Sequence, residues 1–160
     1  MQTNSGHHAM MNDRLLSYGT VLLRVALGAT FLMAVTDRFG LWGPPGTHNV
    51  SWGNFESFLG YTALLNPYLP AAWIPAVGWL VTVAETLFGV ALIAGIQTRK
   101  VAALSGVLLL AFALGMMMGT GIKAPFNYSV FSASAGALLL ATAASYPWSV
   151  DAWQQRRWGA

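Results

Sequence analysis

Two ionisable residues lie inside long apolar stretches of this 160-residue chain. Arg24 interrupts the run LLRVALGATFL, and Glu85 lies within VTVAETLFGVALIAG. A lone charge at the centre of a bilayer costs at least about 2.5–3.5 kcal/mol by insertion scales, so such residues are either paired or functional. Two roles are open to Arg24 and Glu85. They form a structural clamp between two helices, or they are catalytic residues that relay a proton or bind a polar ligand.

A second polar group flanks the apolar stretches. Asp37 and Arg38 follow the first stretch, and Lys123, Asn127 and Tyr128 belong to GIKAPFNYS at the start of the last. A lysine, a tyrosine and an asparagine beside apolar walls are suited to holding a carbonyl, such as that of a quinone head group, or a lipid. The simpler alternative is an ordinary surface ion pair of Lys123 with Asp37, which would contribute little.

Several kinds of chemistry are not expected. The histidines are His7, His8 and His48, all outside the apolar stretches, so none is placed to ligate a transmembrane haem. The chain has no cysteine and no zinc, iron–sulfur, P-loop or dinucleotide motif. We therefore expect no metal site, and a redox role would need a quinone or a cofactor held by a partner chain. Eight basic residues spread along the chain make no nucleic-acid patch.

The composition indicates a membrane protein. Hydrophobic residues make up 56% of the chain and charged residues 8%, against roughly 25% charged in soluble domains. Open strands cannot cross lipid, so spans must be helices of about 20 residues. We predict an all-α fold, an integral membrane four-helix bundle over 14–147, whose small residues allow close packing. Four stretches qualify as spans: about 15–36, 73–96, 101–119 and 125–146.

The basic residues near the span ends predict the orientation. Five lie on the side of the two termini and two on the other, which favours both termini in the cytoplasm of a bacterial or archaeal inner membrane. We expect residues 1–13 to be a flexible tail and 148–160 to be an interfacial segment. The run from Leu15 is too long for the hydrophobic region of a signal peptide, so we expect it to be retained.

The long connection between the first two spans contains a further helix. Phe55, Phe58, Leu59, Thr62 and Leu65 fall at helical spacing, Ser51 is placed to cap the start, and Asn66-Pro67 ends the pattern. We predict a short amphipathic helix at the membrane surface, in the first outer loop. The tryptophans and tyrosines around it suit either an interfacial aromatic belt or a lid over an outward-opening site.

The predicted spans place Arg24 and Glu85 at similar depths. Arg24 lies nine residues beyond Leu15, about 13 Å at 1.5 Å per residue, and Glu85 lies eleven before Ile96, about 16 Å. We predict that Arg24 and Glu85 contact each other directly or through one water or side chain.

The chain resembles the DoxX/DoxD family of small four-helix membrane proteins over about 15–145. The resemblance rests on LLRVALGATFLMAVTDRFG, VAETLFGVALIAGIQTRKVAALSG and KAPFNYSVFSASAGALLLA, taken in that order. Many members carry Gly-x-x-Lys at the end of the first span, where this chain has Thr36-Asp37-Arg38. A role of that lysine therefore does not transfer to Arg38.

The resemblance implies a membrane subunit of a quinone-linked oxidoreductase complex, acting with partner chains and binding quinone or lipid between its helices. The alternative is a non-catalytic accessory subunit that docks on a larger membrane complex through its small-residue faces. We expect its protein partners to be other membrane subunits or further copies of this chain. A transporter is disfavoured because the chain shows no inverted repeat and few polar positions in its spans.

Overall fold

The computed structural model describes residues 3–158, with side chains for all of these except 3–10, 13 and 158. Every regular element in this part of the chain is helical, which confirms the all-α class. The elements are α1 (Thr3–Arg38), α2 (Phe55–Leu65), the 3-10 turn η1 (Ala71–Trp73), α3 (Ile74–Ala94), α4 (Thr98–Thr120), α5 (Ala124–Asn127), α6 (Val130–Ala141) and α7 (Val150–Trp158).

Three helical stretches are long and apolar enough to cross a membrane, namely 14–38, 71–94 and 98–120. They match the first three predicted spans in position to within a few residues. Their apolar side chains are largely exposed on the isolated chain, as expected where lipid is the solvent; examples are Leu22, Leu80, Leu87, Val107 and Leu114. The structure therefore agrees with a lipid bilayer environment.

The fourth predicted span is not one continuous helix over 125–146. It consists of α5, a turn at Ser129, and α6. Ser129 has φ +55°, a left-handed conformation that interrupts the helix, and Thr142 ends α6. The 12 residues of α6 span about 18 Å, less than the ~30 Å hydrocarbon core. A fourth crossing, and with it the four-helix count, stays a prediction.

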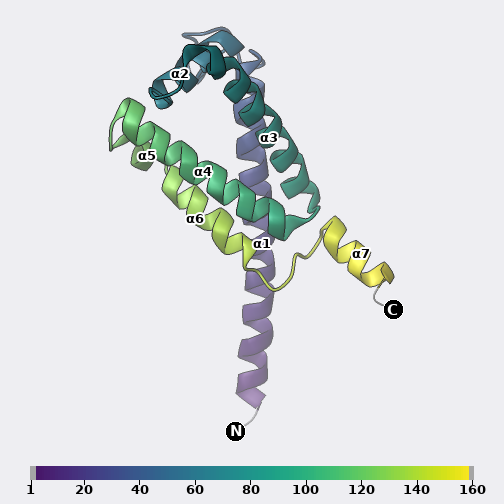
Figure 1. The fold of residues 1–160 in the computed structure, drawn as a ribbon. Helices are drawn as coiled ribbons and strands as arrows, with labels where there is room; N and C mark the ends of the chain where they lie inside the picture. Colours follow the sequence, from purple (N-terminus) through teal and green to yellow (C-terminus); the bar gives the residue numbers. More distant parts are fainter. Residues whose placement is uncertain (1–2, 159–160) are drawn as a thin grey trace.

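The first helix begins at Thr3, inside the segment expected to be a flexible tail. Extending an existing helix adds one hydrogen bond per residue without a new nucleation cost, which explains why α1 continues past the apolar stretch. Figure 1 shows the N-terminal half of α1 running well beyond the other helices. This half exposes Leu15, Leu16 and Leu22.

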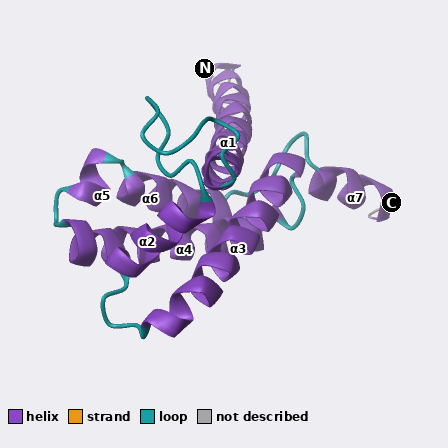
Figure 2. Cartoon of the chain, turned by 90° about the horizontal axis from the view of Figure 1, so that it is seen from above, coloured by secondary structure: helices purple, strands orange, loops and turns teal. Residues whose placement is uncertain are grey.

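Two closely packed helix pairs form the body, α1 with α3 and α4 with α6 (Figures 1 and 2). Glycines make these contacts close. A Cβ on Gly28 would lie 2.8 Å from the carbonyl oxygen of Gly89, and a Cβ on Gly106 would lie 2.6 Å from the Leu138 side chain. Ser134 also donates to the carbonyl of Gly106 at 2.8 Å. The small residues thus serve packing within the chain.

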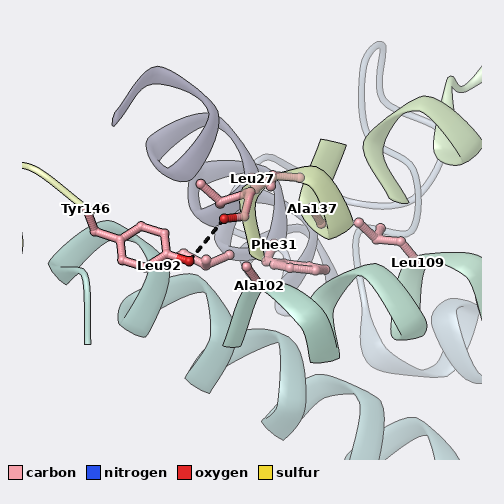
Figure 3. Packing of buried hydrophobic residues seen from close by; sticks show 8 residues of the cluster. Leu27, Phe31, Leu92, Ala102, Leu109, Ala137 and Tyr146 are labelled. Carbon is pink, nitrogen blue, oxygen red and sulfur yellow. Dashed lines mark hydrogen bonds between the residues drawn. The ribbon is translucent and has the colours of Figure 1, made fainter. Parts of the chain in front are cut away.

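The buried apolar core lies where these pairs meet. Its side chains come from α1, α3, α4, α6 and the segment after α6 (Figure 3). The Tyr146 hydroxyl donates to the carbonyl of Leu140 at 3.1 Å, which satisfies its polar end inside the core. The core members are Leu27, Phe31, Leu92, Ala102, Leu109, Ala137, Leu140 and Tyr146.

The helix in the loop after α1 is present as α2. Its buried residues are Phe58, Thr62 and Leu65, three of the five positions that the spacing indicated. The predicted cap at Ser51 is wrong, because Asn54 caps α2 by accepting the Ser57 N–H at 2.8 Å. The helix packs on α3 and α4. Its position at a membrane surface stays a prediction.

Candidate functional site

Arg38, the last residue of α1, forms a buried ion pair with Glu85 of α3. The Arg38 guanidinium contacts the Glu85 carboxylate of α3, and both side chains are 2–3% exposed. Arg38 Nη1 also donates to the Thr82 hydroxyl at 3.0 Å. Thr82 precedes Glu85 by three residues, so both groups lie on the same face of α3. One arginine therefore binds two groups one helical turn apart.

Aromatic side chains cover the ion pair. The Arg38 Cζ lies 3.8 Å from the centroid of the Phe58 ring and 5.3 Å from that of Trp52. An arginine over an aromatic face gains a cation–π attraction, which strengthens when water is excluded. Phe58 belongs to α2, so this helix contributes to the cover over Arg38.

Asp37 fixes the position of the loop that carries Trp52. Its Oδ2 accepts the backbone N–H groups of Ser51 and Trp52, each at 3.0 Å. The loop must fold back tightly to bring these groups to Asp37. Gly53 allows this, because its φ is +68° and a Cβ there would lie 2.9 Å from the Gly43 carbonyl oxygen. Asp37 is thus a positioning residue for Trp52.

Two buried polar atoms at this site have hydrogen-bonding capacity left over. Asp37 Oδ1 and Arg38 Nε make no hydrogen bond within the described part of the chain. Buried polar atoms without a partner are unfavourable by roughly 1–3 kcal/mol. The site is thus a closed polar cluster with two unused hydrogen-bonding groups.

The predicted contact between Arg24 and Glu85 is wrong. Arg24 Nη2 donates to the Trp148 carbonyl at 2.8 Å and Nη1 to the Pro147 carbonyl at 3.3 Å. The packing of Gly28 against Gly89 sets a register that places Arg24 beside Gly95, the C-cap of α3. Ten residues separate Gly95 from Glu85, which is about 15 Å along α3.

Arg24 instead takes part in fixing the segment before α7. Asp151, in the first turn of α7, accepts the N–H groups of Gln97 and Thr98 at 2.8 and 2.7 Å, and its own N–H donates to the Gly95 carbonyl at 2.9 Å. A carboxylate at the first N–H groups of α4 caps that helix and complements its dipole. Arg24 thus ties the segment before α7 to α1, and Asp151 ties the start of α7 to the α3–α4 connection.

The other predicted contacts do not gather with Asp37. Lys123, Asn127 and Tyr128 are exposed around α5, and Tyr128 is 75% exposed. Lys123 forms no ion pair with Asp37, since Arg38–Glu85 is the one ion pair among residues with described side chains. Tyr128 instead lies near Tyr61 of α2, whose pKa is raised mainly by burial and further by Tyr128. Among residues with described side chains, no hydrogen bond or ion pair joins Asp37 to Lys123, Asn127 or Tyr128.

Sequence reasoning did not identify Arg38 as the partner of Glu85. The useful signal was Thr82, which lies one turn from Glu85 on the same helix face. A basic residue at the end of the preceding antiparallel helix was the natural partner for both groups.

Two grooves lie elsewhere on the surface, and neither is lined by Arg38 or Glu85. Among residues with described side chains, no group of three or more histidine, aspartate or glutamate residues could hold a metal ion. Comparisons with protein-family models, with curated proteins and with solved structures found no match.

Proposed function

We propose that this chain is a membrane-embedded accessory subunit of a quinone-linked oxidoreductase complex. The resemblance to the DoxX/DoxD family supplies the quinone-linked setting. The observation that supports an accessory role is that the buried charged groups of the helix pair α1–α3 bind groups of this chain. Arg38 binds Glu85 and Thr82, and Arg24 binds two backbone carbonyls.

A catalytic residue has to reach its substrate or a path for protons. Arg38 and Glu85 are almost completely buried, and Phe58 and Trp52 cover them. A buried arginine–carboxylate pair of this kind fixes the register of two helices. In the accessory role, the pair holds α1 and α3 in one arrangement, and partner chains carry the redox chemistry.

The docking surface in this proposal is the outer apolar surface of the helices. The small residues that were expected to dock on a partner are occupied within the chain, as for Gly28 against Gly89 and Gly106 against Leu138. Large apolar side chains on the outer faces of α3 and α4, such as Leu80, Leu87 and Val107, are exposed. They are available to lipid and to membrane-embedded partner subunits.

A second candidate function is binding of a quinone head group at the Arg38 cluster itself. The unused hydrogen-bonding groups of Asp37 Oδ1 and Arg38 Nε favour it. A head group would have to displace Trp52, which Asp37 holds over the site. This candidate gives Glu85 a direct role in proton transfer, whereas the accessory role does not.

Glu85→Gln separates the two candidates, because it removes the charge and keeps the side-chain size. Quinone reduction by membranes and the amount of chain recovered with its partner subunits are measured on the same samples. An accessory subunit loses activity only in proportion to the complex that is lost. Loss of quinone reduction with the complex intact would favour the quinone-binding candidate. Glu56→Gln, at an exposed position of α2, is the matched control.

A further inference from the structure

The C-terminal helix α7 packs closely on no other helix. Among the closely packed helix pairs in the described part of the chain, none includes α7. Figures 1 and 2 both show it projecting from the body. Its nine residues are too few for a stable helix in water without packing, because isolated helices shorter than about 12–15 residues are marginal. An external surface is therefore needed to stabilise α7.

Hydrogen bonds place the start of α7 beside the ends of α3 and α4. The Asp151 N–H donates to the carbonyl of Gly95, the C-cap of α3. Its carboxylate accepts the N–H groups of Gln97 and Thr98, where α4 begins. Both helices are long and apolar enough to cross a membrane, and such helices end near the edge of the hydrocarbon core. The start of α7 therefore lies at the head-group level of one leaflet.

One face of α7 carries an aromatic ring and two cations. Trp153, Arg156 and Arg157 are spaced i, i+3 and i+4, so they are neighbours on the helix surface. All three are exposed, Trp153 by 51%. The Arg157 Cζ lies 4.8 Å from the centroid of the Trp153 ring. A guanidinium stacked on a ring keeps the N–H donors at its edge free, and their spacing matches two oxygens of one phosphate.

No acidic side chain balances the two cations of α7. Asp151 is the one acidic residue in 86–160, and both of its carboxylate oxygens already accept N–H groups at the start of α4. Neither arginine is in an ion pair among the residues with described side chains. Arg99 and Lys100, exposed in the first turn of α4, add positive charge at the same end of the molecule. The exposed surface of α7 is thus complementary to anions.

We propose that the face of α7 formed by Trp153, Arg156 and Arg157 binds anionic phospholipid head groups in the leaflet beside the α3–α4 connection. The tryptophan ring lies at the boundary between head groups and acyl chains, and the guanidinium groups bind phosphate oxygens. The level at which α7 begins favours lipid over an acidic protein, because lipid phosphates surround the helix ends there. This binding does not depend on the accessory role.

Amide hydrogen exchange of the full chain in lipid nanodiscs tests the head-group contact. The discs contain phosphatidylcholine alone, or phosphatidylcholine mixed with phosphatidylglycerol of the same acyl chains. We expect exchange at residues 152–157 to slow several-fold with phosphatidylglycerol, because charge attraction favours the bound helix over its unfolded form. High salt should remove the difference, since it screens exposed charges. Equal exchange in the two lipids would overturn the proposal.

Charge variants separate head-group binding from the intrinsic stability of α7. Arg156→Gln/Arg157→Gln should exchange equally fast in both lipids, whereas Arg156→Lys/Arg157→Lys keeps the charges and should keep most of the difference. Arg157→Gln alone should lose part of it. Lys123→Gln also removes one exposed charge, beside α5, and should respond to phosphatidylglycerol as the unmodified chain does. A double glutamine variant that still responds fully would contradict the proposal.

A spin label tests which face of α7 meets the bilayer. The chain has no cysteine, so Gln155→Cys provides a single labelling site. Position 155 lies about 200° around the helix from Trp153, on the opposite face. We expect the label to move more slowly with phosphatidylglycerol and to stay accessible to a water-soluble relaxation agent. Unchanged motion, or a label that the agent does not reach, would overturn the assignment of this face.

Discussion

Arg38 at the end of α1 and Glu85 in the middle of α3 form a buried ion pair that ties the two helices together. Thr82 and the Phe58 ring complete the surroundings of the guanidinium. Asp37, next to Arg38 in the chain, fixes the loop that covers the pair. Arg38 and its neighbour Asp37 therefore have different structural roles. Arg38 links two helices, whereas Asp37 links α1 to the loop that follows it.

Removing one partner of the ion pair should destabilise the chain. Glu85→Ala leaves the Arg38 guanidinium buried without its carboxylate, which costs about 3–5 kcal/mol in buried pairs of soluble proteins. We expect a clearly lower thermal unfolding temperature in detergent. Arg38→Ala/Glu85→Ala should be less destabilised than the sum of the two single variants. Additive effects in this double-mutant cycle would show that the two side chains are not coupled.

The Arg24 contacts should hold the segment before α7 and, through it, the first turn of α7. Arg24→Leu removes two hydrogen bonds from a charged donor, which are worth about 1.5–3 kcal/mol each. We expect amide hydrogen exchange at residues 149–153 to accelerate, while exchange in the middle of α3 stays the same. Lys123→Leu, at an exposed position beside α5, is the control. Unchanged exchange at 149–153 would mean that Arg24 does not restrain the segment.

Asp151 should stabilise the start of α4. Asp151→Ala removes the acceptor for the Gln97 and Thr98 N–H groups, and loss of a helix cap costs about 0.5–2 kcal/mol. We expect faster exchange of these two amides. Asp151→Asn keeps an acceptor oxygen and should restore part of the protection. Equal protection in all three proteins would exclude the capping role.

The close contact of α1 with α3 should not tolerate a side chain. A Cβ on Gly28 would lie 2.8 Å from the Gly89 carbonyl oxygen, a backbone atom that cannot move without shifting α3. We expect Gly28→Ala to lower stability by about 1–3 kcal/mol. Gly19→Ala on the same helix meets no atom within 4 Å and should be neutral or slightly stabilising. Thermal unfolding in detergent compares the two, and equal effects would contradict the register of α1 on α3.

The sequence predicted where the helices lie along the chain better than how they align against one another. Apolar length located the three long helices, and helical spacing located Phe58, Thr62 and Leu65 on the buried face of α2. Both signals are local, so they can be recognised without knowledge of the tertiary structure. The break at Ser129 was not visible in an apolar stretch that contained no internal proline after Pro125.

Hydropathy could not predict which charged residues form an ion pair. Counting from Leu15 placed Arg24 at the depth of Glu85, but α1 begins near the start of the chain and packs through Gly28 on Gly89. That contact shifts Arg24 to the end of α3. Ion pairs between helices depend on such shifts, because one turn moves a charge by about 5.4 Å.

In the proposed function, Arg38 and Glu85 serve as a clamp within an accessory subunit. Arg38→Gln/Glu85→Gln removes both charges together, and replacing a buried pair by neutral groups is often tolerated. The decisive measurement is quinone reduction per assembled complex in membranes that carry this double variant. The clamp predicts the same value as for the unmodified chain. An intact complex that no longer reduces quinone would contradict it.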